Sequence, residues 1–314
     1  MAGAALVTGA AGFFGLAIVR ALVRAGVPVI ATDRADEPAW RDGAAPARYE
    51  RRDVAVEPLD DLVAEAAGIV HAAALTPADE TPGATGDALL AVNLAPLPAL
   101  LRAARAGEGG RRLILISSAG VFEQTAPRAL AEEDADGGSS LYGAAKLAAE
   151  LVARRYAALY GLEYAAVRPT SLFGAGEVVR PSRTRVTGLA QLVGHAVRGE
   201  PVRLEDPGSR ADWLCVDDAA DAIVALWHAP ALEGRAYNLS SARPRPFAEV
   251  ADAVAAACGL ALDPAGTVVR GGPDRGAVIS NRRIREALDW APSRSLEDGA
   301  RDLAGYLEAV AASR

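Results

Sequence analysis

Three polar residues in the middle of the chain have the types and spacing of a proton-transfer site. Tyr142 and Lys146 lie four positions apart in a segment with helical periodicity, so both side chains project from one helical face. A phenol is too weak an acid to be a base at neutral pH, but a cation one helical turn away stabilises phenolate. Ser118 ends the apolar strand before that helix and would hydrogen-bond the same substrate oxygen. These residues predict a base that takes a hydroxyl proton while hydride leaves the same carbon.

Such chemistry needs a hydride acceptor, and the start of the chain is suited to hold one. An apolar run, the glycine-rich stretch 8–15 and an amphipathic run follow one another, which predicts strand, turn and helix. Gly9 permits a tight turn, Gly12 lets the backbone approach a pyrophosphate, and Gly15 allows close packing of helix on strand. The free N–H groups of the helix N-terminus favour phosphates. This stretch therefore predicts a dinucleotide site.

The residues that follow indicate which dinucleotide binds. Asp33 lies roughly twenty residues past the turn, where a carboxylate accepts from a free ribose 2′-hydroxyl and repels a 2′-phosphate. We therefore predict NAD as the cofactor, while Arg34 would suit the phosphate of NADP. Asp53, at the end of a weak third strand, is either an acceptor for the adenine amino group or an ordinary strand-end carboxylate.

The elements that must position these residues alternate as strand and helix through the first half of the chain. This order predicts an α/β fold, a Rossmann-type doubly wound parallel sheet with right-handed crossovers. Segment 84–106 is typical of one long helix, kinked at Pro96 and Pro98. The acidic, glycine-rich stretch 131–140 predicts a mobile loop with solvated charges.

Past Pro169 the pattern becomes irregular and indicates a second, smaller domain. We expect residues 1–169 to form the NAD-binding Rossmann domain, completed by about 211–240. Residues 170–210 and 241–314 are expected to form a mixed α/β substrate-binding domain on the C-terminal side.

Composition and charge limit the possible partners. The 314 residues are 51% hydrophobic and 23% charged, as in ordinary globular proteins. A net charge of −7 and a pI near 5.2 argue against a nucleic-acid partner and favour a small molecule. No run reaches the roughly 18 uninterrupted apolar residues of a membrane span, so we expect no membrane partner and a cytoplasmic location. The two cysteines and three histidines lack metal-ligand spacing, so no metal is expected.

Further short motifs accompany the glycine turn and the Ser–Tyr–Lys set. They are His71-Ala72-Ala73-Ala74, Asn93, Arg168-Pro169, the segment 212–218 and the segment 288–292. Together, and over nearly the whole chain, these motifs resemble the extended short-chain dehydrogenase/reductases, the NAD-dependent epimerase/dehydratase family of sugar-modifying enzymes.

The resemblance implies a role for each matching residue. Ser118 and Tyr142 would polarise and deprotonate the substrate, and Lys146 would hold the nicotinamide ribose. The implied cofactor-binding residues are Gly9, Gly12, Phe13, Phe14, Gly15, Asp33, Arg34, Asp53, Val54, Ala72, Ala73, Ala74, Asn93, Tyr142, Lys146 and Pro169. The candidate substrate-binding residues are Ser117, Ser118, Ser171, Arg180, Arg183, Arg185 and Arg210. Guanidinium groups suit carboxylate or phosphate, although a solvated basic loop would also explain the arginines between 180 and 185.

Three departures from the family pattern bear on the reaction. Ala119-Gly120 stand where dehydratases and decarboxylases of the family carry an extra carboxylate, which leaves epimerisation or simple oxidation. Ser171 stands in place of an asparagine near the diphosphate of nucleotide sugars. Ala211 separates Arg210 from Asp212, whereas nucleotide-sugar enzymes place the arginine directly before the aspartate.

We therefore expect an NAD-dependent enzyme that oxidises an anionic sugar derivative, most simply a nucleotide-sugar epimerase. One alternative is an NAD-dependent dehydrogenase of a free sugar or sugar acid. A second is a non-catalytic, dinucleotide-sensing regulator. The resemblance also implies a homodimer formed through helices near 84–106 and 141–160.

Overall fold

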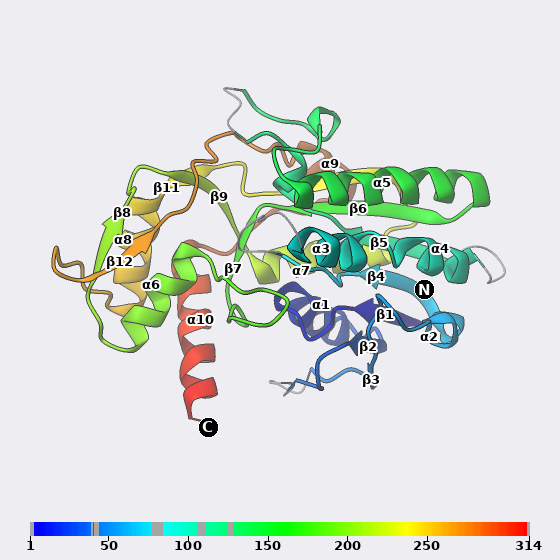
Figure 1. The fold of residues 1–314 in the computed structure, drawn as a ribbon, viewed down its shortest axis with the longest axis horizontal. Helices are drawn as coiled ribbons and strands as arrows, with labels where there is room; N and C mark the ends of the chain where they lie inside the picture. Colours follow the sequence, from blue (N-terminus) through cyan, green and yellow to red (C-terminus); the bar gives the residue numbers. More distant parts are fainter. Residues whose placement is uncertain are drawn as a thin grey trace.

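A seven-stranded parallel sheet forms the centre of the molecule (Figure 1). The structure, a computed structural model, describes residues 3–38, 40, 44–76, 84–105, 111–124 and 128–312. In spatial order the strands are β10 (Glu233–Leu239), β6 (Glu163–Pro169), β5 (Arg112–Ile116), β4 (Ala66–His71), β1 (Ala4–Thr8), β2 (Val29–Asp33) and β3 (Arg48–Arg51). From β1 the chain adds β2 and β3 on one side, and then β4, β5, β6 and β10 on the other. The switch point therefore lies between β1 and β4, and open sheets of this kind bind ligands at such a point. The predicted Rossmann-type fold is confirmed.

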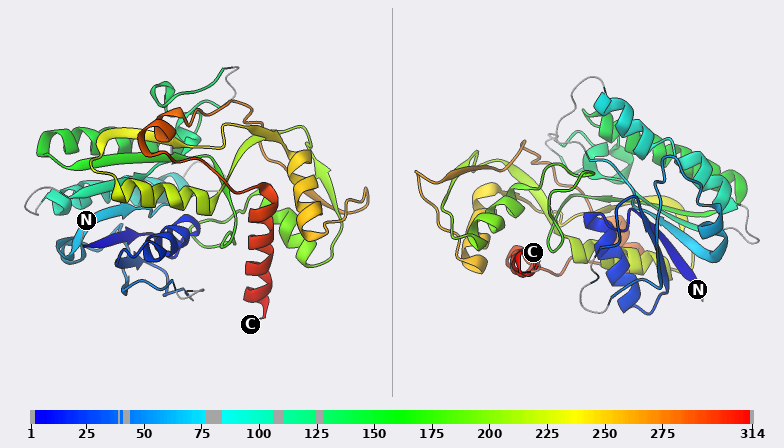
Figure 2. Two further views of the ribbon diagram at one scale, coloured as in Figure 1. Left: turned by 180° about the vertical axis from the view of Figure 1, so that it is seen from behind. Right: turned by 60° about the horizontal axis from the view of Figure 1, so that its bottom comes forward.

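Helices cover both faces of this sheet (Figures 1 and 2). One face packs against α1 (Phe13–Arg24) and α7 (Val216–His228). The other packs against α2 (Asp60–Glu65), α4 (Leu97–Arg105) and α5 (Leu141–Tyr160), with α3 (Ala84–Asn93) beside α5. In α1 the fully buried residues Ile18, Val19 and Leu22 recur at the spacing of one helical face, so the helix lies flat on the sheet.

The segment expected to be one long, kinked helix is instead two helices. Helix α3 ends at Asn93, and α4 begins at Leu97 after a turn. Pro96 lies in that turn, where its missing N–H and fixed ring oppose a continuous helix. By length and composition Gly86–Arg105 would pass as a membrane-spanning helix, but the leucines of α4 pack into the core beneath the sheet.

The smaller part of the molecule has its own core beyond the carboxyl ends of the large sheet (Figure 1). Its sheet consists of β11 (Pro244–Pro246), β9 (Arg210–Cys215) and β7 (Ser171–Phe173), and β12 (Thr267–Arg270) pairs with β8 (Val202–Glu205). Its helices are α6 (Gly188–Val197), α8 (Phe247–Cys258) and α10 (Leu296–Ala311). Helix α9 (Arg282–Leu288) and the following Trp290 return to the larger core. The chain thus crosses between the two parts several times.

A buried arginine ties α7 to the sheet. The Arg112 side chain is 3% exposed and forms an ion pair with Glu163 of the neighbouring strand at 2.5 Å. Its Nη1 also donates to the carbonyls of Leu226, Trp227 and Ala229 at distances of 2.7–3.0 Å. These carbonyls lie at the C-terminal end of α7, where the Leu226 carbonyl also accepts from the backbone N–H of Ala229 at 3.3 Å. Arg112 thus supplies further donors at a helix end, where backbone carbonyls lack their usual partners.

Replacing this arginine should destabilise the fold strongly. We expect Arg112→Ala to lower the free energy of unfolding by about 3 kcal/mol, because three carbonyls and a carboxylate lose their donor. Arg235→Ala, which removes a solvent-exposed partner of Glu233 on β10, should cost less than about 0.5 kcal/mol. Urea unfolding followed by circular dichroism measures both, and equal losses would contradict the structural role of Arg112.

Candidate active site

The glycine turn fits closely against the end of the neighbouring strand. Gly9 has a φ of +68°, and a Cβ there would lie 2.5 Å from the backbone nitrogen of Ala73. A Cβ on Gly15 would collide with the Gly9 carbonyl, and one on Gly12 would lie 3.0 Å from the same oxygen. Side chains at Gly9 and Gly15 would force the turn away from the segment after β4 and from the start of α1, and one at Gly12 would crowd the N-cap of that helix. Glycine therefore keeps open the approach that a dinucleotide pyrophosphate requires.

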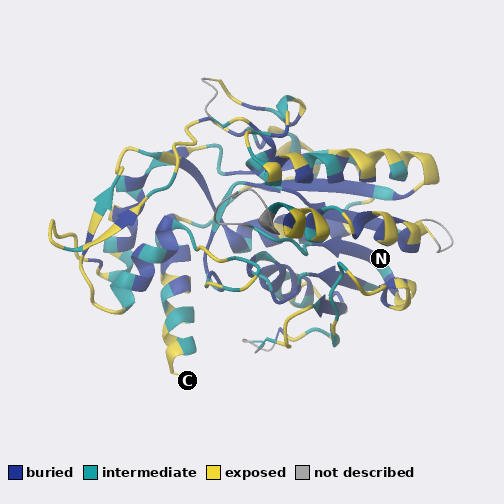
Figure 3. Cartoon of the chain, viewed as in Figure 1, coloured by how far each residue is buried: buried dark blue, intermediate teal, exposed yellow. Residues whose placement is uncertain are grey.

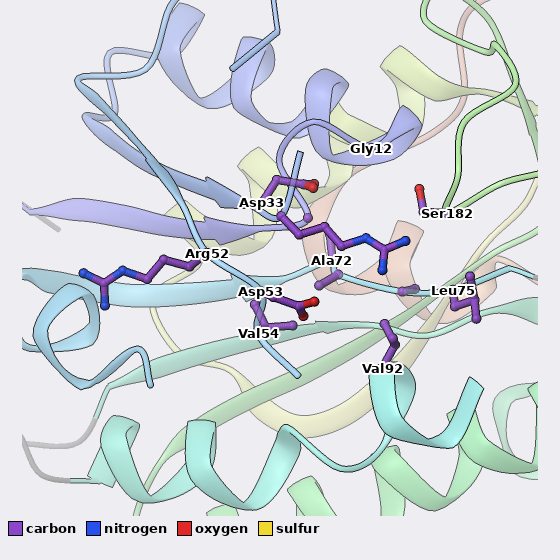
Figure 4. Close-up of a pocket in the computed structure, with 13 residues that line it drawn as sticks. Gly12, Asp33, Arg52, Asp53, Val54, Ala72, Leu75, Val92 and Ser182 are labelled. Carbon is purple, nitrogen blue, oxygen red and sulfur yellow. The ribbon is translucent and has the colours of Figure 1, made fainter. Parts of the chain in front are cut away.

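The carboxylate of Asp33 is held at the carboxyl end of β2, at the edge of the same opening (Figure 4). Its Oδ2 accepts from the backbone N–H of Ala11 at 3.1 Å, and its Oδ1 from that of Ala35 at 3.0 Å. Gly12, Asp53 and Ala72 border the opening from three other segments, and we call this space the dinucleotide cleft. The open glycine turn and the fixed carboxylate fit the diphosphate and ribose of NAD.

Two motif residues act behind the wall of the cleft. The pKa of His71 is lowered to about 3 by burial and, secondarily, by the charge of Lys146, so its ring is neutral at physiological pH. Its Nδ1 lies 2.8 Å from Oγ1 of Thr8, which joins β4 to β1. Asn93 accepts from the backbone N–H of Leu75 and donates to its carbonyl, at 2.8 and 2.9 Å. Both residues hold the strand end that forms the wall.

The predicted catalytic residues converge on a second space, which we call the catalytic cavity. Ser118 follows β5, and its Oγ accepts from the N–H of Gly120 at 3.0 Å. Tyr142 lies in the first turn of α5, which Ser140 caps through the N–H of Gly143 at 2.9 Å. Lys146 is buried and donates to the Ile116 carbonyl at 3.1 Å, with Nζ 5.7 Å from the centre of the Tyr142 ring. All three side chains line the cavity.

A buried ion pair fixes the two elements that carry these residues. Glu150 of α5 binds Arg168 of β6 through both carboxylate oxygens, the shortest contact being 2.6 Å between Oε2 and Nη2. The hydroxyl of Ser117 donates to Glu150 as well. Ser117 is thus engaged with the core although it reaches the cavity wall, whereas Ser118 faces the cavity from the next position.

The stretch 131–140 differs from the solvated loop expected from its charges. It contains a short 3₁₀ helix, Glu132–Asp134, and the Glu132 side chain is 4% exposed. Its carboxylate accepts from the backbone N–H of Asn238 at 3.0 Å, and its carbonyl from Nη1 of Arg168 at 2.7 Å. The stretch is therefore fastened beneath the catalytic cavity by long-range contacts.

The two spaces adjoin, and most predicted residues border them. Gly9, Gly12, Ala72, Ala74 and Ser182 border both. Every predicted cofactor residue except Asn93 lines one or the other. Of the predicted substrate residues, Ser117, Ser118, Ser171 and Arg183 line the catalytic cavity, and Arg180 borders the dinucleotide cleft instead.

The remaining two predicted substrate residues lie elsewhere. Arg185 is exposed, and neither it nor Arg210 lines the dinucleotide cleft or the catalytic cavity. Arg210 donates to the carbonyl of Pro244 at 2.9 Å, because its strand position directs it to the neighbouring β11. Substrate contact at these two residues therefore stays a prediction.

Sequence reasoning missed several lining residues. Gln124, Thr187 and Arg275 line the catalytic cavity, and Ser182 lies where it meets the dinucleotide cleft. Arg275 lies in an irregular segment far along the chain, which no periodicity marks. Its side chain has no ion pair among the described residues. The described lining of the cavity contains no aspartate, glutamate or histidine.

Comparison with known proteins agrees with this geometry. The sequence model of the NAD dependent epimerase/dehydratase family matches residues 5–240. The chain belongs to this family. It is therefore an enzyme of an NAD-dependent family whose cofactor the cleft accommodates, although the family name covers more than one reaction.

Members of the epimerase/dehydratase family with different activities resemble the chain over most of its length. It is 30% identical over 308 residues to UDP-glucose 4-epimerase from Mycolicibacterium smegmatis, covering 94% of this chain and 95% of the relative. It is 28% identical over 316 residues to dTDP-glucose 4,6-dehydratase from Streptomyces niveus, covering 94% and 89%. Among solved structures, MoeE5 in complex with UDP-glucuronic acid and NAD has a TM-score of 0.82 at 26% identity, covering 98% of this chain and 100% of that one.

Paired substitutions separate the two adjacent serines. We expect Ser118→Ala to lower kcat by about 10²–10³-fold with NAD affinity unchanged, because the cavity loses a hydrogen-bond donor to the reacting oxygen. Ser117→Ala should leave kcat within a few-fold and lower the free energy of unfolding by about 1 kcal/mol, since it removes a buried hydrogen bond to Glu150. Steady-state kinetics and urea unfolding measure the two effects, and the reverse pattern would assign the substrate contact to Ser117.

Proposed function

We propose that the protein is a nucleotide-sugar epimerase, which oxidises a sugar carbinol and then reduces the resulting ketone from its other face. One observation carries this proposal: Ser118, Tyr142 and Lys146 meet in a cavity that adjoins the dinucleotide cleft and whose described lining holds no carboxylate. The only acid–base chemistry that these side chains offer is the removal and return of one hydroxyl proton.

The proposed mechanism follows from where each group lies. Ser118 and Tyr142 hydrogen-bond the substrate hydroxyl, and the Tyr142 phenolate accepts its proton. The ammonium group of Lys146 is buried and held by the Ile116 carbonyl, so it stays near the Tyr142 ring and stabilises the phenolate. NAD, when bound, supplies the hydride acceptor for the carbinol carbon. Tyr142 then gives the proton back as the ketone is reduced.

The lining of the cavity favours this reaction over elimination or decarboxylation. Dehydration needs an additional acid or base to remove a proton from carbon and to protonate the leaving hydroxyl. Ala119 and Gly120 occupy the 3₁₀ turn after Ser118, where neither side chain can serve. We therefore interpret the similarity to a dTDP-glucose 4,6-dehydratase as common ancestry of two enzymes that share the oxidation step and differ in the steps that follow.

The charge of the cavity supports an anionic substrate. Arg183 and Arg275 line it together with Lys146, and only Arg183 pairs with a carboxylate of the described chain, that of Glu177. A guanidinium without an acidic partner suits a diphosphate or a sugar carboxylate. Relatives named for UDP-glucose and UDP-glucuronic acid make uridine diphosphate sugars the first substrates to examine.

We also propose that the protein is a homodimer through α5. Leu151, Val152, Leu159 and Tyr160 are 44–64% exposed and recur along α5. Figure 3 shows several exposed stretches along this helix. Such a stripe of large apolar side chains is typical of a helix that packs against a second copy. Sedimentation that shows only monomer at micromolar concentration would contradict this proposal.

The reaction type can be tested with one set of assays. Purified enzyme with excess NAD⁺ and a panel of nucleotide sugars and free sugar acids should convert a nucleotide sugar to its epimer without stoichiometric rise in absorbance near 340 nm. Tyr142→Phe should lower kcat by about 10²–10⁴-fold. Tyr156→Phe, which removes a hydroxyl from the same helix outside the catalytic cavity, is the matched control and should have little effect.

Two results would contradict the proposal. Stoichiometric NADH release would establish a dehydrogenase instead. An enzyme that binds NAD but turns over no sugar of the panel would support a dinucleotide-sensing regulator. So would an activity that Tyr142→Phe leaves unchanged.

A further inference from the structure

A segment of the smaller part crosses the opening between the dinucleotide cleft and the catalytic cavity. We call residues 176–187, between β7 and α6, the strap. Its Ser182 borders both spaces, and the Ser182 carbonyl accepts from the backbone N–H of Thr76 at 3.1 Å. Thr76 follows β4 of the large sheet, so the strap is attached to the far side of the opening that it crosses. Figure 4 shows Ser182 opposite Asp53 and Val54 across the cleft.

The strap is held in this position by a buried carboxylate. Glu177 is fully buried and accepts from Arg183 Nη2 at 2.8 Å, and from the backbone N–H and hydroxyl of Thr187 at 2.8 and 3.0 Å. Arg180 and Arg183 exchange two backbone hydrogen bonds of 2.9 Å, which close a tight loop. The Arg183 guanidinium lies 5.4 Å from the ring centre of Phe13 at the start of α1. These contacts within the protein give the strap a defined shape.

In this conformation the strap directs Arg180 and Arg183 into different spaces. Arg183 lines the catalytic cavity, whereas Arg180 borders the dinucleotide cleft with Gly12, Asp33 and Arg34. Nη1 of Arg180 donates to the Gly176 carbonyl at 2.8 Å, and its side chain hydrogen-bonds Tyr306 of α10. Arg180 and Asp33 line the same cleft. Burial lowers the pKa of Arg180, while Tyr306 and Asp33 oppose that shift.

The neighbours of Arg180 indicate which group it meets. Gly12 caps the N-terminus of α1, the end of a helix at which dinucleotide phosphates bind. Asp33 is placed for a ribose hydroxyl and cannot hold a phosphate. A guanidinium that shares this cleft has a phosphate as its natural partner, because it donates up to two parallel hydrogen bonds to phosphate oxygens.

We propose that Arg180 binds the diphosphate of the dinucleotide and that the strap thereby slows release of the cofactor. This function differs from the substrate role that the sequence suggests for Arg180. The value of slow release for catalysis rests on the proposed function, because an epimerase must keep NADH bound until the ketone has rotated to present its other face. The binding role of Arg180 requires only that NAD enters the cleft.

The test measures cofactor release in the absence of any sugar. NADH bound to the enzyme is displaced by excess NAD⁺ in a stopped-flow fluorimeter, and equilibrium affinities are measured for NADH, ADP-ribose and adenosine. Arg180→Ala should speed NADH release by about 10–100-fold and weaken ADP-ribose similarly, because both ligands carry the diphosphate. Adenosine binding should stay within two-fold, and Arg180→Lys should show an intermediate loss.

The control is Arg185→Ala, which removes an exposed arginine of the same strap and should leave NADH release within two-fold of wild type. Thermal unfolding shows whether Arg180→Ala remains folded, and Arg180→Lys gives a second measurement if it does not. NADH release unchanged in both Arg180 variants would overturn the proposal, as would equal weakening of adenosine. No sugar turnover is needed, so failure of the epimerase proposal would leave this test intact.

Discussion

Glu150 accepts hydrogen bonds from Ser117 at the end of β5 and from Arg168 near the end of β6, and the geometry of the active site depends on this buried set. Glu150 belongs to α5, the helix that carries Tyr142 and Lys146. The helix and the strands cannot slide past one another without leaving a buried charge unpaired, which is far more costly than losing an exposed pair. The distance between Ser118 and Tyr142 is therefore set by the folded core.

The two adjoining spaces differ in charge: acidic and basic side chains both line the dinucleotide cleft, whereas the described lining of the catalytic cavity has basic side chains and no acidic ones. The dinucleotide cleft is lined by the carboxylates of Asp33, Asp36, Asp53 and Glu57 and by the guanidinium groups of Arg34, Arg51, Arg52 and Arg180. The described lining of the catalytic cavity is cationic, which suits an anionic sugar derivative. The strap joins the two, because one of its arginines faces each space. Under the two proposals made above, cofactor retention and substrate recognition are properties of a single segment.

The sequence predicted those features that arise from local chain geometry. A strand–turn–helix unit needs glycine where a phosphate approaches its backbone, and stretch 8–15 shows that pattern. Tyr142 and Lys146 share a helical face because of their spacing alone. The direction of Arg180 could not be predicted, since it depends on contacts with the buried end of the strap and with α10. The burial of Glu132 could not be predicted either. The backbone N–H that its carboxylate binds belongs to Asn238, about a hundred residues further along the chain, and no local pattern reveals such a contact.

The central claim is that hydride leaves the sugar and returns to the same carbon without leaving the enzyme. It is tested most directly with UDP-glucose and UDP-glucuronic acid carrying deuterium at C4, unlabelled NAD⁺, and mass spectrometry of sugar and cofactor after several turnovers. We expect the epimerised sugar to keep its deuterium at C4 while free NADH stays unlabelled and scarce. Deuterium in released NADH, or an epimer that has lost its label, would contradict this mechanism.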